Sequence, residues 1–305
     1  MPQPTASDKN QACVGGMREA VATCHIGAGL HARCAMKTIL VHVREPQGDT
    51  PAVQHAVALA AAMHAGLTAV YAAPLYFGSA VEPALAAVLI EDTRRLVAAA
   101  IAARPGFLAR AAAAGVTPCR WLVAEGRPDE ALSQVAPRHD LLMLDHADGD
   151  TGAGSDIAGI VLRTGIACVV LPRSVGAFRQ PVRLAIGWNG SSEAMRAVHA
   201  ALPLLPGAEV LLMQGEERER YPGLAWYPPF DIAEYLREHG AKVEVQPIAE
   251  RADAAGGALL AHADAFGADL LVMGAYGRGR FSEWVLGGVT RDALRLARMP
   301  LLLCH

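Results

Sequence analysis

Residues 274–290 are the stretch of the chain whose residue types and spacing best suit the binding of a ligand. Five glycines fall within fifteen residues, between an apolar run that ends at Gly274 and a helical pattern that begins near Thr290. Glycine permits positive φ and close backbone approach to a ligand. Successive N–H groups, together with the positive end of a helix dipole, can then hold an anion. The alternative is that these glycines only shape a long turn.

Other chemistries find little support in the sequence. No Gly-Lys-Ser/Thr follows the glycines, so the segment is not a P-loop. A dinucleotide fingerprint would follow the first strand of its unit, whereas this loop follows the fourth. Arg278 and Arg280 are either phosphate contacts or solvated loop charges. No G-x-S-x-G elbow, no H-E-x-x-H motif and no paired carboxylates at helical spacing are found, so catalysis has no positive support.

Short apolar strands alternate with helices from residue 36 onward, which predicts parallel βαβ units. We expect a first series with strands 37–43, 67–73, 120–123, 141–145 and 167–171 and helices 51–65, 85–114, 128–136 and 157–164. We expect a second series with strands 182–188, 210–214, 243–248, 270–274 and 301–304 and helices 192–204, 231–239, 252–266 and 290–298. Gly66 is expected to stop the first helix. Pro105 is expected to mark a break in the long helix, which reads as one helix or two.

The two series share short sequence matches as well as the order of their strands and helices. Residues 139–144 (HDLLML) correspond to 268–273 (ADLLVM), and 164–172 correspond to 297–304. A duplicated fold follows: an α/β chain of two tandem five-stranded, mostly parallel sheets flanked by helices. The expected parts are 36–172, a polar linker 173–181, and 182–305. Residues 1–35 show no period, and we interpret them as a disordered or misassigned extension; a short regulatory arm is the alternative.

The glycine spacing carries a family resemblance. Gly274, two residues, Gly277, nine residues and Gly287 resemble the G-x2-G-x9-G-[S/T] loop of ATP-binding universal stress proteins. The resemblance covers residues 182–305, and 36–172 more weakly. It implies a Rossmann-like fold of the adenine nucleotide alpha hydrolase type, a role in sensing or regulation of stress, and a bound adenine nucleotide: ATP, ADP or AMP.

The resemblance also implies which residues bind. The phosphate loop would contain Met273, Gly274, Gly277, Gly287, Gly288 and Val289. The segment after the first strand would contain Trp188, Asn189, Gly190 and Ser191. Gly288 stands where the family has Ser or Thr, so a hydroxyl for a terminal phosphate is missing. Asn189 stands where the family has Asp, which weakens the case for Mg²⁺. The alternative is a module without nucleotide that acts through dimer or partner contacts.

The first series departs further from the motif. Asp140 to Ala167 spans 27 positions, against 31 from Asp269 to Pro300, so its loop is four residues shorter. Asp145, Asp148 and Asp150 lie in this region, and their charges repel phosphate. We therefore expect a degenerate, non-binding copy. A Ca²⁺ or Mg²⁺ loop is the alternative, although no Glu stands at an EF-hand position.

Composition and the absence of targeting signals narrow the classes of function that this chain can have. The chain has 305 residues, 52% of them hydrophobic, and a net charge of −3, which argues against disorder, nucleic-acid binding and attraction to anionic membranes. No signal peptide is recognised, so we expect a cytoplasmic protein. Cys119, Cys168 and Cys304 are expected to be buried free thiols. The apolar closing strands, 167–171 and 301–304, are expected to pair with each other as a pseudo-dimer, or with a second chain as a homodimer. An unknown protein partner is also expected.

Overall fold

The computed structural model describes residues 36–75, 83–146, 156–172, 180–215, 227–249, 255–275 and 288–305. Residues Met36–His305 form one compact unit. The expected extension 1–35 and most of the linker 173–181 lie outside the described residues, as do Gly277, Gly287, Arg278 and Arg280 of the glycine segment.

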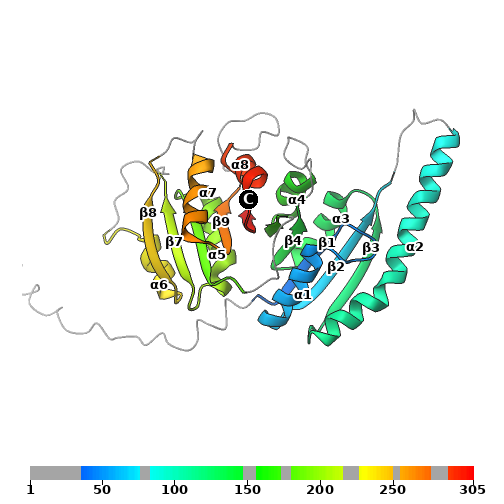
Figure 1. Ribbon diagram of the computed structural model, residues 1–305, viewed down its shortest axis with the longest axis horizontal. Coiled ribbons are helices and arrows are strands. Elements are labelled where there is room, and N and C mark those ends of the chain that lie inside the picture. Colours follow the sequence, from blue (N-terminus) through cyan, green and yellow to red (C-terminus); the bar gives the residue numbers. More distant parts are fainter. Residues whose placement is uncertain are drawn as a thin grey trace, which may run out of the picture. The chain divides into compact units, whose positions relative to one another are not determined.

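Strands and helices alternate in both halves (Figure 1). The first half contains β1 (Thr38–Val43), α1 (Pro51–Met63), β2 (Gly66–Ala73), α2 (Pro83–Ala113), β3 (Cys119–Glu125), α3 (Pro128–Val135), the short 3-10 helix η1 (Ala136–Arg138), β4 (Leu141–Asp145), α4 (Asp156–Thr164) and β5 (Ala167–Leu171). The second half contains β6 (Arg183–Trp188), α5 (Ser192–Ala201), η2 (Leu202–Leu204), β7 (Glu209–Gln214), α6 (Ile232–Glu238), β8 (Lys242–Pro247), α7 (Ala255–Phe266), β9 (Leu270–Gly274), α8 (Gly288–Leu296) and β10 (Leu301–Cys304).

Strand order is the same in both halves. The full order is β3-β2-β1-β4-β5-β10-β9-β6-β7-β8, so each half has its first strand between its second and fourth. Pairing within each half is parallel. The order reverses between β1 and β4, and again between β6 and β9. In open sheets of this kind, ligands bind outside the carboxyl ends of the strands at such a switch point.

The closing strands β5 and β10 pair with each other. They run antiparallel, with Leu302 opposite Val169. The expected contact between these two apolar edges is therefore confirmed, and it is made within the chain. The expectation of two separate sheets is wrong, because this pairing joins the two five-stranded sets into one ten-stranded sheet. The pairing leaves neither closing strand as an open edge whose unpaired backbone groups could pair with another chain.

One hydrophobic cluster extends across both halves. It packs α3 and α4 of the first half, and α7 and α8 of the second, against the same set of strands. Leu142, Leu271 and Leu303 are among its fully buried members. Because side chains alternate along a strand, alternate residues of the central strands, such as Leu142 and Leu144 of β4, face this cluster. The halves therefore share a core as well as a sheet.

The duplication extends to single hydrogen bonds. The Asp140 carboxylate accepts from the backbone N–H groups of Lys37 and Thr38, at 2.8 and 2.9 Å. The Asp269 carboxylate accepts from those of Val182 and Arg183, both at 3.0 Å. In each half, an aspartate before the fourth strand thus secures the start of the first strand.

Helix α2 is one continuous helix of 31 residues with Pro105 inside it, so the expected break at this proline is absent. Its buried face includes Ala100 and Phe107, which lie against Trp121 of β3: the indole N–H donates to the Ala100 carbonyl at 2.9 Å. Among the described residues, Ala84–Ala113 is the one helix long and apolar enough to span a membrane, by length and composition only. Helix α1 ends earlier than expected, since His64 takes the left-handed position in place of Gly66.

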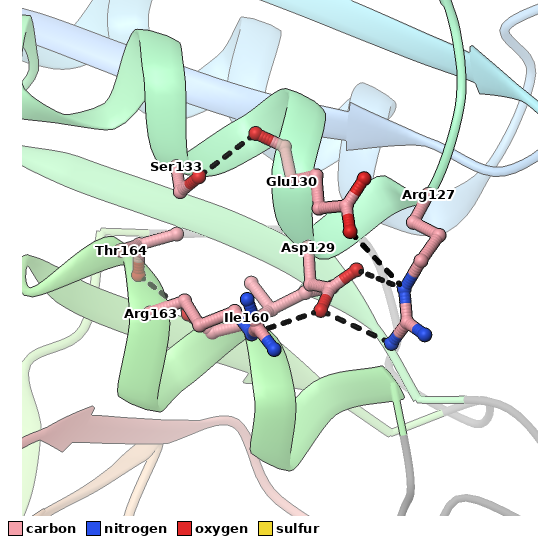
Figure 2. A network of polar contacts seen from close by, with 7 residues as sticks. All are labelled: Arg127, Asp129, Glu130, Ser133, Ile160, Arg163 and Thr164. Carbon is pink, nitrogen blue, oxygen red and sulfur yellow. Dashed lines mark hydrogen bonds and ion pairs between the residues drawn. The ribbon is translucent and has the colours of Figure 1, made fainter.

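A buried carboxylate joins α3 to α4 (Figure 2). The Asp129 side chain accepts from Arg127 at 3.1 and 3.2 Å and pairs with Arg163 of α4 at 3.1 Å. Burial alone would raise the pKa of Asp129, but the hydrogen bond from Arg127 and the charges of Arg127 and Arg163 outweigh it, so the pKa is lowered. Asp129 therefore acts as an ionised link between two helices of the shared core.

Replacing Leu302 with aspartate tests the joint between the halves. Leu302 is fully buried in β10 between β5 and β9, so Leu302→Asp should cost more than about 3 kcal/mol of unfolding free energy, as an unpaired buried charge does. Leu122→Asp on the edge strand β3, where 39% of Leu122 is exposed, is the matched control and should cost much less. Urea denaturation followed by circular dichroism measures both. Equal losses would show that the joint carries no special weight.

Replacing Asp129 with asparagine tests the link between α3 and α4. Asp129→Asn should lower the unfolding free energy by about 1–2 kcal/mol at neutral pH, the scale of a hydrogen bond to a charged group. Because the folded-state pKa is lowered, the native contribution exists above the ordinary pKa and is lost as the pH falls through the lowered one. The two proteins should thus converge in acid. Glu130→Gln, at an exposed side chain 3.9 Å from Arg127, serves as control. A loss that is independent of pH would contradict the ionised link.

Candidate functional site

The switch point of the second half lies between β6 and β9. These strands pair in parallel, with Gly187 opposite Met273, so their carboxyl ends lie side by side. The chain leaves β6 through Asn189, Gly190 and Ser191 into α5, and it leaves β9 at Gly274 into the glycine segment. The structure therefore places side by side, at the carboxyl ends of β6 and β9, the points where the chain enters the two segments that the sequence singled out.

A tight turn leads from β6 into α5. The Asn189 side-chain oxygen accepts from the Ser191 N–H at 3.2 Å, and Gly190 takes the left-handed conformation with φ of 71°. Ser191 is the N-cap, and its hydroxyl accepts from the Ala194 N–H at 3.1 Å. The Asn189 amide N–H₂ group takes no part in this hydrogen bond, which is made by the side-chain oxygen. Asn189 and Gly190 are exposed, so a ligand can reach this turn.

Gly274 lies directly against the first turn of α5. A Cβ at this position would lie 2.6 Å from the Ala194 nitrogen and 2.8 Å from the Glu193 carbonyl carbon. Real side chains do not approach backbone this closely, so any residue other than glycine would displace the helix. The position therefore has a packing role, the seating of α5 on β9, which the glycine spacing alone did not indicate.

Two of the expected site residues are core residues. Trp188 is 6% exposed and Met273 is 4% exposed. Met273 belongs to the shared cluster under α7 and α8, and the Trp188 carbonyl accepts from the Gly215 N–H at 2.8 Å. Their side chains pack in the core next to the switch point. They can affect binding only by positioning the backbone of the residues that follow them, Asn189 and Gly274.

Helix α8 begins at the end of the glycine segment. Gly288 is its first residue and is exposed, with no atom within 4 Å of the place a Cβ would occupy. Val289 is half-buried, and its Cα lies 3.2 Å from the place a Cβ would occupy on Gly256 of α7, so Gly256 allows α7 to contact the start of α8. Because α8 follows β9 in the chain and leads to parallel β10, its positive end lies at the carboxyl edge of the sheet.

A buried acid beneath the site was missed in the sequence. Glu193 is 7% exposed in the first turn of α5 and accepts from the Ser192 hydroxyl at 3.1 Å. Its charge also acts on Cys304: burial raises the pKa of that thiol, Arg196 lowers it and Glu193 raises it further. Acidic residues in a first helical turn are common, so nothing in the sequence distinguishes this one. Its negative charge opposes a highly charged ligand nearby.

Metal and thiol chemistry find no positive support among the residues that the structure describes. They contain no group of three or more His, Cys, Asp or Glu side chains placed to hold a metal ion. Cys168 and Cys304 are buried free thiols as expected, while Cys119 is half-buried. Burial raises the pKa of Cys168 to about 12, which leaves it protonated and unreactive at neutral pH.

The strand order and the two switch points define a duplicated, mostly parallel α/β protein, and comparison with known proteins identifies the family. The Universal stress protein family model matches residues 36–144 and 183–305. The chain therefore belongs to the universal stress protein family. No curated protein matches it significantly.

Solved structures resemble the chain in fold. A universal stress protein from Archaeoglobus fulgidus DSM 4304 aligns with a TM-score of 0.64 and 14% identity, over 88% of this chain and 95% of its own. A putative universal stress protein from Pseudomonas aeruginosa UCBPP-PA14 aligns with a TM-score of 0.55 and 12% identity, over 90% and 94%. A universal stress protein solved in complex with cAMP is 22% identical over 46% of this chain and 99% of its own, with a TM-score of 0.33.

Substituting Gly274 tests its packing role without any ligand. Gly274→Ala should lower the unfolding free energy by about 1–3 kcal/mol, as overpacking does, because the new methyl group would meet α5 backbone at 2.6 Å. Gly288→Ala is the matched control, since nothing lies within 4 Å of its Cβ position; it should be neutral or stabilising by up to about 1 kcal/mol. Thermal and urea denaturation measure both variants. Equal stability of the two would contradict the close approach of α5.

Proposed function

We propose that this universal stress protein binds an adenine nucleotide at the carboxyl edge of its second half and acts in the cytoplasm as a stress sensor or regulator through a protein partner. The observation that carries the proposal is the G-x2-G-x9-G segment leaving β9 at the switch point. Both the spacing, typical of the ATP-binding members of the family, and the place in the fold favour the same ligand.

The residues present fit a nucleotide with few phosphates. Gly274, Gly277, Gly287 and Gly288 can turn backbone N–H groups toward a phosphate, and the start of α8 adds its dipole. Gly288 lacks the hydroxyl that would bond a terminal phosphate, and the Glu193 carboxylate lies buried in the neighbouring turn. Both features favour a mono- or diphosphate over a triphosphate with Mg²⁺.

The turn after β6 suits the sugar of the nucleotide. The Asn189 side-chain oxygen is used by the Ser191 N–H, so its amide N–H₂ group can donate to a ribose hydroxyl. Asn189 lacks the charge that would attract Mg²⁺, and metal therefore plays at most a subordinate role. Trp188 and Met273 hold this edge in place from within the core, as their burial indicates.

A second candidate is a module that has lost nucleotide binding and works through protein contacts alone. Gly288, Asn189 and the buried Glu193 favour it, since each removes or opposes a contact that a triphosphate would use. Isothermal titration calorimetry with AMP, ADP and ATP, with and without Mg²⁺, discriminates the two. Mass analysis of any nucleotide released from the purified protein by denaturation complements it.

We predict that Gly277→Val abolishes nucleotide binding and leaves the fold intact. A branched side chain at this position would prevent the backbone from approaching a phosphate. Gly257→Val is the control, since Gly257 lies on an exposed face of α7 with no atom within 4 Å of its Cβ position, and it should bind like the wild type. Calorimetry measures the affinities. Unchanged binding in Gly277→Val would place the ligand elsewhere.

The double variant Asn189→Asp with Gly288→Ser completes this test. Restoring the family's acid and hydroxyl should strengthen binding of ATP with Mg²⁺ by about 1–3 kcal/mol, the scale of hydrogen bonds to charged groups. If neither the wild type nor the double variant binds any adenine nucleotide, the second candidate is the correct function.

A further inference from the structure

The corresponding edge of the first half is filled by one of its own side chains. Asp145 ends β4, and its Oδ1 accepts from the backbone N–H of Ala52, in the first turn of α1, at 2.7 Å. The N-cap of α1, Thr50, makes no side-chain cap to its own helix. Arg44, the residue after β1, donates from Nη1 to the Asp145 carbonyl at 3.4 Å. A helix start and an arginine thus surround a carboxylate supplied by the chain.

The second half has the same strand register and different side chains at these two positions. Ile39 pairs with Leu141 in the first half as Leu184 pairs with Leu270 in the second, so the register of the central strands is identical. Counting along the strands, Asp145 corresponds to Gly274 and Arg44 to Asn189. Helix α5 is capped by its own Ser191, and β9 sends no carboxylate toward it because its last residue is glycine.

The surroundings of Asp145 are those of an anion site. An N–H in the first turn of a helix has no partner within the helix, and it commonly binds a phosphate or carboxylate. The pKa of Asp145 is raised overall, because burial outweighs Thr50, the Ala52 N–H and Arg44, each of which lowers the pKa. The Thr50 hydroxyl is buried beside this carboxylate, with 5% of the residue exposed. These groups act on the Asp145 carboxylate as they would on a bound anion.

We propose that Asp145 is a built-in anion that closes the first half to phosphate-bearing ligands, so that the chain offers at most one nucleotide site. The exclusion is both steric and electrostatic: the carboxylate occupies the Ala52 N–H and places a negative charge where a phosphate would lie. Asp145 is thus a specificity-determining residue of the tandem arrangement. The inference concerns the first half alone and holds whether or not the second half binds nucleotide.

Removing the carboxylate while keeping its Cβ tests the proposal. In Asp145→Ala, the Ala52 amide loses its acceptor and should exchange about tenfold faster, the loss of roughly one hydrogen bond. Millimolar inorganic phosphate should then slow that exchange again and shift the Ala52 amide resonance. In the wild type and in Asp145→Asn, whose side-chain oxygen still accepts from Ala52, phosphate should change neither quantity. Hydrogen exchange and amide NMR of the full chain provide the readouts.

The outcomes separate this inference from the function of the second half. All measurements are repeated in the Gly277→Val background, where a response at Ala52 cannot come from the second site. A phosphate response at Ala52 in the wild type, or none in Asp145→Ala, overturns the proposal. If Asp145→Ala fails to fold, Asp145→Ser replaces it. Failure of both to fold also overturns the proposal, since the carboxylate would then be a structural requirement of α1.

Discussion

The antiparallel pairing of β5 with β10 is the contact on which the rest of the architecture depends. It satisfies the backbone of two apolar strands that would otherwise form open edges, and it lets one hydrophobic cluster extend under helices from both halves. It also fixes a direction. The strands within each half are parallel, and the two halves meet through the antiparallel pair β5 and β10. The carboxyl ends of the strands in one half therefore point in the direction opposite to those in the other half. The two switch points therefore lie at opposite ends of the strands.

Within this frame, the halves agree in architecture and differ in charge. They share strand order, register and the paired hydrogen bonds of Asp140 and Asp269. Among the differences are the residues at two strand ends: Arg44 and Asp145 at the first switch point, and Asn189 and Gly274 at the second. The fold is therefore shared by the two halves, while the charge at the carboxyl ends of their central strands is not.

Much of the fold could be read from the sequence because the elements are short, apolar and bounded by glycine and proline. The correspondence between β4 and β9 was visible in the matching segments 139–144 and 268–273. One further step in the same comparison pairs Asp145 with Gly274, so the difference between the halves was present in the sequence too. What could not be read was the contact each residue makes. The approach of Gly274 to α5 and the burial of Glu193 depend on how a helix settles on a strand, which spacing does not encode.

The joint between the halves also has a genetic consequence. In a symmetric homodimer, one codon change alters both subunits, so a substitution that suits one site must be tolerated at the other. Here the two copies lie on one polypeptide and meet through β5 and β10, so each codon changes one copy only. An aspartate can arise at the end of β4 while the end of β9 keeps its glycine. A covalent pair of this kind lets the two copies diverge one residue at a time.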